Sequence, residues 1–156
     1  MPDPQSFITS NLGRFRAELY DFLRIPSVSL QTQHSGDTRR AAEWLAGRCA
    51  EAGLDQEIFE TPGHPIVLAE WRGAEGAPTV LIYGHYDVQP PEPIEQWTSP
   101  PFEPTEREGR IYARGSADDK GQLYMHVKAL EAHLATTSSL PINVVVLAEG
   151  EEEVGS

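Results

Sequence analysis

The sequence predicts an α/β fold in which helices flank a mixed or mostly parallel sheet. Two helical patterns come first, a run of short β-type segments follows, and a third helical pattern leads into a last strand that is almost wholly apolar. Alternation of this kind is typical of α/β proteins. With 156 residues, 39% of them hydrophobic, the chain is long enough to build a core.

The two N-terminal helices are predicted from apolar residues that recur every three or four positions. The first pattern covers residues 6–22 and should end before Pro26, because the residue preceding a proline is pushed out of the helical conformation. The second covers residues 41–52, and Ser35 or Asp37 is the expected N-cap. Both helices are expected to serve as packing elements.

Beyond Gly53, which should close the second helix, the pattern changes to that of β-strands. Short segments rich in β-branched and aromatic residues are separated by proline and glycine, at residues 54–60, 66–71 and 79–83. The proline-rich stretch 90–104 is too kinked for a regular element. We therefore expect an ordered loop there.

The last part of the chain repeats this alternation. Residues 110–113 are expected to form a short strand, and the apolar residues between Leu123 and Leu134 predict a third helix. The final strand, residues 142–148, is nearly all apolar, as expected for a strand that is covered on both faces.

Charge and cysteine content narrow the class of protein. Lysine and arginine total 12 against 24 aspartates and glutamates, and the resulting net charge of -12 would repel the phosphates of a nucleic-acid partner. Cys49 is the only cysteine and cannot form an intramolecular disulfide. The start of the chain lacks a signal-peptide pattern, and no apolar run approaches the roughly 20 residues that span a bilayer. We expect a cytoplasmic protein with no nucleic-acid or membrane partner.

The first candidate site motif, Gly84-His85-Tyr86-Asp87, directly follows a predicted strand. An imidazole can bind a divalent ion through one nitrogen while a nearby carboxylate holds the other N–H. Taken alone, a His-x-Asp pattern is more often a polar turn.

The second motif, residues 113–121, contains Asp118 and Asp119 and opens the third helix. A carboxylate there can bridge two metal ions, but the start of a helix also favours aspartate as a cap. Taken alone, capping is the better explanation for at least one of the two aspartates.

The third motif, residues 149–156, is a run of glutamates that follows the final strand. Most acidic runs are solvated surface. The position of this run argues for a site, because open α/β sheets bind ligands beyond the carboxyl ends of their strands and all three motifs lie at such ends. Two carboxylates and a histidine from separate strands could therefore converge on one crevice.

Taken together, the three motifs resemble a family of dinuclear zinc or manganese peptidases and deacylases. This family includes carnosinase-like dipeptidases, aminoacylases, acetylornithine deacetylase and bacterial glutamate carboxypeptidase. The resemblance runs from about residue 25 to residue 156, and its strongest parts are residues 84–90, 112–121 and 149–156. Their order and spacing match together, which makes the combined pattern specific although each part is not.

The resemblance implies a role for the first two motifs. His85 is expected to bind one metal ion, Asp87 to orient that histidine, and Asp118 to bridge both ions. The implied cofactor is a pair of divalent ions, with zinc expected and manganese or cobalt as alternatives.

Within the glutamate run, the resemblance implies that Glu152 is the general base and that Glu153 binds the second metal. Three consecutive glutamates also permit a shift by one to Glu151. The sequence Val154-Gly155-Ser156 favours the first assignment, because it fits the Glu-Glu-x-Gly-Ser ending of the family.

The implied reaction is hydrolysis of a peptide bond in dipeptides or short peptides. Metal ions lower the pKa of water toward neutrality, so that Glu152 could take its proton and return it to the leaving amine. The sequence of residues 85–90 favours a dipeptidase over a deacetylase. The alternatives are an N-acyl amino acid deacylase of the same family and a non-catalytic metal-binding domain.

Two further ligands that the family uses, an acidic residue and a histidine, would lie beyond Ser156. We therefore expect residues 1–156 to be the N-terminal portion of a zinc-peptidase catalytic domain, without the lid domain and the C-terminal part. The resemblance also allows a homodimer for the full-length protein. With two protein ligands for each ion, the 156-residue chain alone should bind metal weakly and lack peptidase activity.

Overall fold

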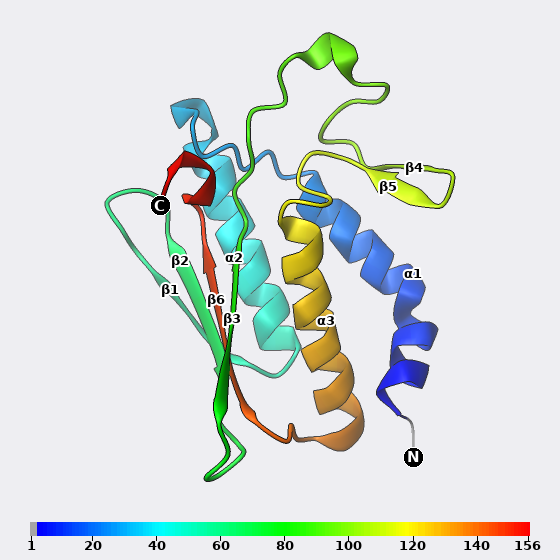
Figure 1. The fold of residues 1–156 in the computed structure, drawn as a ribbon, viewed down its shortest axis with the longest axis vertical. Helices are drawn as coiled ribbons and strands as arrows, with labels where there is room; N and C mark the ends of the chain where they lie inside the picture. Colours follow the sequence, from blue (N-terminus) through cyan, green and yellow to red (C-terminus); the bar gives the residue numbers. More distant parts are fainter. Residues whose placement is uncertain (1–2) are drawn as a thin grey trace.

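The computed structural model describes residues 3–156 and has two layers, a four-stranded sheet and the helices that pack on one of its faces (Figure 1). Its helices are α1 (Pro4–Leu23), α2 (Ser35–Glu51) and α3 (Lys120–Thr137). Its strands are β1 (Asp55–Phe59), β2 (Ile66–Trp71), β3 (Thr79–His85), β4 (Thr105–Arg107), β5 (Arg110–Tyr112) and β6 (Asn143–Glu149). Short 3-10 turns are η1 (Thr32–His34), η2 (Ile94–Gln96) and η3 (Glu152–Val154).

The main sheet is mixed, which confirms the predicted fold class. Its strand order is β1-β2-β6-β3, and only the β6–β3 pair is parallel. In that pair His85 lies opposite Glu149, so the carboxyl ends of both strands meet at one edge of the sheet. The first and third site motifs therefore leave the sheet side by side.

Strand β6 is not covered on both faces within residues 3–156, and that expectation was wrong. Val144, Val146 and Ala148 are buried beneath the helices, whereas the alternate residues, Val145 and Leu147, stay partly exposed. The reason is that α2 packs on β1 and β2, α3 on β3, and α1 on α3, all on the same side (Figure 1). Burial therefore alternates with the period of two of a strand that is covered on one face.

The predicted end of α2 is confirmed, but its predicted start is not. Gly53 follows the helix with φ +92°, a left-handed conformation that glycine adopts without strain. At the other end neither Ser35 nor Asp37 is the N-cap, since the cap is His34 and Ser35 is already helical. The 3-10 turn η1 runs directly into α2, so that the N–H of Ser35 bonds to the carbonyl of Thr32.

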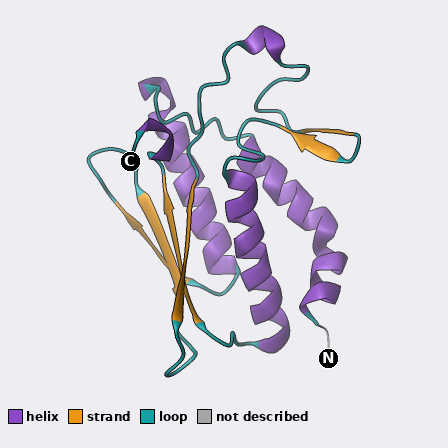
Figure 2. Cartoon of the chain, in the orientation of Figure 1, coloured by secondary structure: helices purple, strands orange, loops and turns teal. Residues whose placement is uncertain are grey.

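The loop predicted over residues 90–104 is present and ordered (Figure 2). The indole N–H of Trp97 donates to the carbonyl oxygen of Pro91 at 2.7 Å. The backbone N–H of Arg114 donates to the carbonyl oxygen of Pro101, also at 2.7 Å. The hairpin β4–β5 that follows was half missed, because only its second strand was predicted. Three-residue strands are too short to show a period, although Gly109, with φ +72°, marks the turn.

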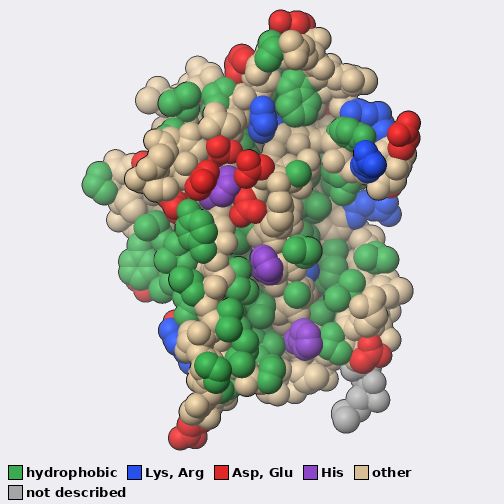
Figure 3. Space-filling view, in the orientation of Figure 1, with side chains coloured by type: hydrophobic (Ala, Val, Ile, Leu, Met, Phe, Trp, Pro, Cys, Tyr) green, Lys and Arg blue, Asp and Glu red, His purple; other side chains and the backbone are tan. Residues whose placement is uncertain are grey.

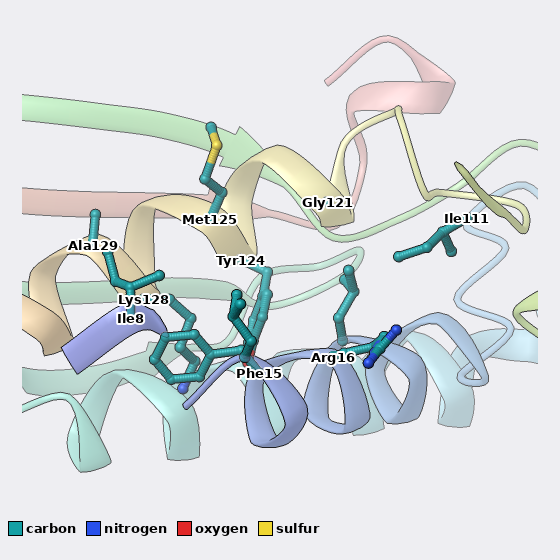
Figure 4. Close-up of a pocket in the computed structure, with 11 residues that line it drawn as sticks. Ile8, Phe15, Arg16, Ile111, Gly121, Tyr124, Met125, Lys128 and Ala129 are labelled. Carbon is teal, nitrogen blue, oxygen red and sulfur yellow. The ribbon is translucent and has the colours of Figure 1, made fainter. Parts of the chain in front are cut away.

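The apolar stripe of α1 faces α3 but leaves a groove of about 340 Å³ between the two helices (Figure 4). Phe15 is buried there, whereas Leu12 and Met125 remain exposed. The groove contains none of the five residues assigned from the sequence motifs. In residues 3–156 no helix combines the length and the hydrophobicity needed to cross a bilayer.

A charged network joins α1 to α3 beside this groove. Glu18 accepts hydrogen bonds from Lys128 Nζ at 2.7 Å, from the Tyr124 hydroxyl at 2.7 Å and from Arg14 at 2.8 Å. Burial works against the ionised carboxylate, but the three donors outweigh it and lower the pKa of Glu18 to about 2.

This shift predicts an acid-dependent loss of stability. The folded-state pKa of Glu18 lies below its unfolded value of 4.5, so the contribution is complete above pH 4.5 and is lost as the pH falls toward 2. Glu18→Gln should lower the free energy of unfolding at pH 7 by about 2–3 kcal/mol and flatten the curve in that window. Urea unfolding from pH 2 to pH 7 measures both effects. The exposed Glu43→Gln is the matched control, and an equal loss in this control would contradict the assignment.

Candidate metal centre

The candidate site lies at the edge of the sheet where β3 and β6 end together. In the space-filling view, acidic side chains gather around a histidine close to this edge (Figure 3). The backbone N–H of Tyr86 donates to the carbonyl of Glu149 at 2.9 Å and extends the parallel pairing by one residue. The sheet itself therefore sets the distance between the histidine motif and the glutamate run.

His85 is held from both sides of its ring. Nδ1 lies 3.1 Å from the carbonyl oxygen of Asp87 and 3.3 Å from its Oδ1. Nε2 points to the acidic cluster, 3.1 Å from Asp118 Oδ1 and 3.8 Å from Glu152 Oε2. Burial opposes protonation of the ring, but the interactions with Asp87 outweigh it and raise the pKa of His85 to about 9. Only 7% of the side chain is exposed, so the ring has one open direction, toward the carboxylates.

Asp87 is fully buried and connects the first motif to the third. Its Oδ2 accepts hydrogen bonds from the Ser29 hydroxyl at 2.6 Å and from the backbone N–H of Glu153 at 3.1 Å. Burial raises the pKa of this carboxyl. Contacts with His85, Ser29 and Glu153 lower the pKa by more than burial raises it, so the net shift is downward. A buried carboxylate with these partners fixes the ring orientation of His85.

The two aspartates that precede α3 have different environments. Asp118 is 75% exposed and contacts His85, whereas Asp119 occupies the N-cap position without capping the helix through its side chain. Asp119 Oδ2 instead accepts the backbone N–H of His85 at 3.2 Å, and burial raises the pKa of Asp119. A Cβ on Gly84 would lie 2.6 Å from this Oδ2, so the close approach requires glycine. Capping by a side chain therefore explains neither aspartate.

The glutamate run forms the turn η3, and its side chains point in two directions. Ligand atoms of His85, Glu152 and Glu153 all lie within 4.8 Å of one another. Glu151 points away, toward Gly63, where an added Cβ would collide with its carboxylate. This arrangement supports the assignment of Glu152 and Glu153 over the shift by one. It also places Glu152, the expected base, among potential ligand atoms, and Asp118 outside that group.

Three further residues contact the site and were not assigned from the sequence. Ser29 and Asp119 have the contacts described above, and Gln89 binds Glu153 through its side-chain amide. One signal was available for Gln89. The polar residues His85, Asp87 and Gln89 alternate in the sequence with Tyr86 and Val88, and alternation along an extended segment places every second side chain on the same side.

The side chains present fit a divalent metal. One imidazole nitrogen and several carboxylate oxygens are ligands that zinc, manganese and cobalt accept. The carboxylates of Asp118, Glu152 and Glu153 gather around one ring although like charges repel, and a cation would relieve that repulsion. The second ring nitrogen already contacts Asp87, with the carbonyl oxygen at 3.1 Å and the buried carboxylate at 3.3 Å, and metal-binding histidines generally have such a partner on the other nitrogen.

Comparison with known proteins finds a family model that matches the site region. The model of peptidase family M20/M25/M40 matches residues 81–156, the stretch that contains all five assigned residues. This match confirms the resemblance that the three motifs indicated. Two curated relatives match nearly the whole length of this chain. They are the cysteinylglycine-S-conjugate dipeptidase of Corynebacterium striatum, with 34% identity over 95% of this chain and 32% of the relative, and the Cys-Gly metallodipeptidase of Schizosaccharomyces pombe, with 33% identity over 96% and 34%.

A shorter match and a solved structure agree with this assignment. A succinyl-diaminopimelate desuccinylase of Xylella fastidiosa is 46% identical over 51% of this chain and 21% of its own length. The crystal structure of human carnosine dipeptidase 1 superposes with a TM-score of 0.90 at 29% identity and covers 96% of this chain and 34% of that one. The chain thus spans about a third of the length of the dipeptidases that it matches, and its M20 fold follows theirs.

Proposed function

We propose that this M20 protein hydrolyses the peptide bond of dipeptides or short peptides in a metal-dependent reaction. The observation that carries the proposal is the convergence of His85 Nε2 with the carboxylates of Asp118, Glu152 and Glu153 at the joined ends of β3 and β6. Residues 1–156 would form the N-terminal portion of the catalytic domain. The two relatives that match nearly the whole chain are both named as dipeptidases, and this similarity supports the substrate class.

His85, Asp118 and Glu153 would hold two divalent ions, with zinc expected and manganese or cobalt as alternatives. When bound, such ions polarise a carbonyl group and lower the pKa of water. Asp87 would keep Nδ1 of His85 engaged, so that only Nε2 is available as a ligand. Asp118 is the most exposed of the three, with 75% of its side chain accessible to solvent.

Glu152 would act as the general base. Its carboxylate is 44% exposed and lies 3.8 Å from His85 Nε2, so it can exchange a proton with water next to the cluster. It would take a proton as water attacks the amide carbonyl and return it to the leaving amine. A homodimeric full-length protein and a cytoplasmic location stay predictions.

A substrate panel tests the proposal on the intact protein. Dipeptides should be hydrolysed, a chelator should abolish the activity, and zinc or manganese should restore it. The desuccinylase match favours a second candidate, hydrolysis of N-acyl amino acids, and these belong in the same panel. Faster turnover of acyl amino acids would replace the dipeptidase proposal, and full activity after exhaustive chelation would remove both candidates.

A further inference from the structure

The backbone and side chain of Glu153 are held by two residues of one short segment. Asp87 accepts the N–H of Glu153 at 3.1 Å. Gln89 Nε2 donates to the carbonyl oxygen of the same residue at 3.0 Å and to its Oε2 at 2.8 Å. Within residues 3–156, Glu153 Oε1 makes no hydrogen bond, so the amide of Gln89 occupies one carboxylate oxygen and leaves the other free.

The neighbouring glutamate has no such support. The Glu152 side chain lies beside His85 at 3.8 Å and is otherwise exposed. The turn η3 that carries both residues is a single 3-10 turn, closed by backbone bonds of 3.1 Å from Val154 to Glu151 and from Gly155 to Glu152. Among the described residues, Gln89 is thus the side chain that selects one orientation for the Glu153 carboxylate.

We infer that Gln89 is a positioning residue, which holds Glu153 in the orientation of a metal ligand. The inference rests on the proposed function, because Glu153 is a ligand only in a metal-dependent enzyme. An amide suits this task for a physical reason. It donates a hydrogen bond without neutralising the carboxylate, whereas a lysine or arginine would offset the negative charge that attracts the ion.

Metal affinity is the direct test, since it does not depend on turnover. Gln89→Met keeps the length of the side chain and removes the donor, so zinc and manganese titrated into the metal-free intact protein should bind about 10–100-fold more weakly. The melting temperature of the metal-free variant should change by less than about 2 °C, because an exposed side chain is altered. Gln33→Met is the matched control, since Gln33 is exposed and, among the described residues, its amide donates a hydrogen bond only to Gln31, and its affinity should equal that of the wild type.

A double-mutant cycle identifies the path of the effect. In a Glu153→Gln background, Gln89→Met should weaken binding less than about twofold, because the ligand that Gln89 positions is already altered. An equal loss in both backgrounds, or an unchanged affinity of Gln89→Met alone, would overturn the inference while the proposed function stands. A wild-type protein that binds neither ion would overturn both.

Discussion

Glu152→Gln in the intact protein is expected to retain near-normal metal content and to lose turnover by about 10²–10⁴-fold. Glutamine has the size of glutamate but cannot accept a proton. The carboxylate of Glu152 is 44% exposed at the edge of the cluster, where it is accessible to water. Metal analysis and turnover at saturating ion, measured on the same samples, separate the two properties.

Glu153→Gln is the matched variant and should fail in the opposite way. A weakened ligand lowers metal occupancy, so excess ion should restore part of the activity. A Glu151→Gln or Glu153→Gln protein that stays fully metallated yet inactive would move the base to that residue. The structure makes Glu151 the weaker candidate, because its carboxylate faces Gly63.

Lys120→Ala is expected to lower the free energy of unfolding by about 3–5 kcal/mol, through a core cavity and the loss of two buried hydrogen bonds. Lys120 is fully buried, and its ammonium donates to the carbonyls of Phe22 at 3.0 Å and of Ile25 at 2.6 Å, just where α1 ends. The Phe22 carbonyl lies in the last turn of α1 and the Ile25 carbonyl lies just beyond the helix, and each also accepts one backbone N–H, from Ile25 and Ser27 respectively. Lys120 thereby links the start of α3 to the end of α1 by hydrogen bonds. Asp118 lies two residues before Lys120.

Lys120→Met separates the two contributions. Methionine fills most of the volume but donates no hydrogen bond, so we expect a smaller loss of about 1–3 kcal/mol. Burial lowers the pKa of Lys120 to about 7, which reflects the cost of keeping an ammonium in the core, and methionine avoids that cost. Urea unfolding of both variants measures the difference, with the exposed Arg110→Ala as control. A loss below about 1 kcal/mol for Lys120→Ala would show that the anchor is not structural.

Long elements with a clear period could be predicted from the sequence. The stripes of α1, α2 and α3 and the strands β2 and β6 repeat their hydrophobic residues often enough to fix their type. The strands of the hairpin β4–β5 are too short to show a hydrophobic period. The N-cap of α2 depended on the turn η1, which has no sequence signature of its own. Coverage of β6 could not be predicted, because an apolar strand has the same composition with one face buried or two.

Some residues of the candidate site could likewise be predicted from the sequence, and others could not. His85 and the glutamates follow from motifs at strand ends, and the parallel β3–β6 pair explains why they meet. Asp118 was expected at such an end too, but it follows the separate hairpin β4–β5 and reaches the site at the start of α3. Ser29 could not be predicted from spacing, since it lies 58 residues from Asp87 and reaches it only through the tertiary fold. The role of Asp119 was ambiguous because a cap and a contact with the backbone of His85 require the same residue type at the same position.

Strand β6 lies between β2 and β3 in the sheet although it follows both in the chain. During synthesis, β1 and β2 can pair as soon as both leave the ribosome, whereas β3 lacks its partner strand until residues 143–149 have emerged. Pairing over such a separation is slow, because the entropy of closing the loop is lost before the contacts are gained. The Glu152–Glu153 turn directly follows β6, so we expect the β3–β6 pair and the acidic cluster to form after β1 and β2 have paired.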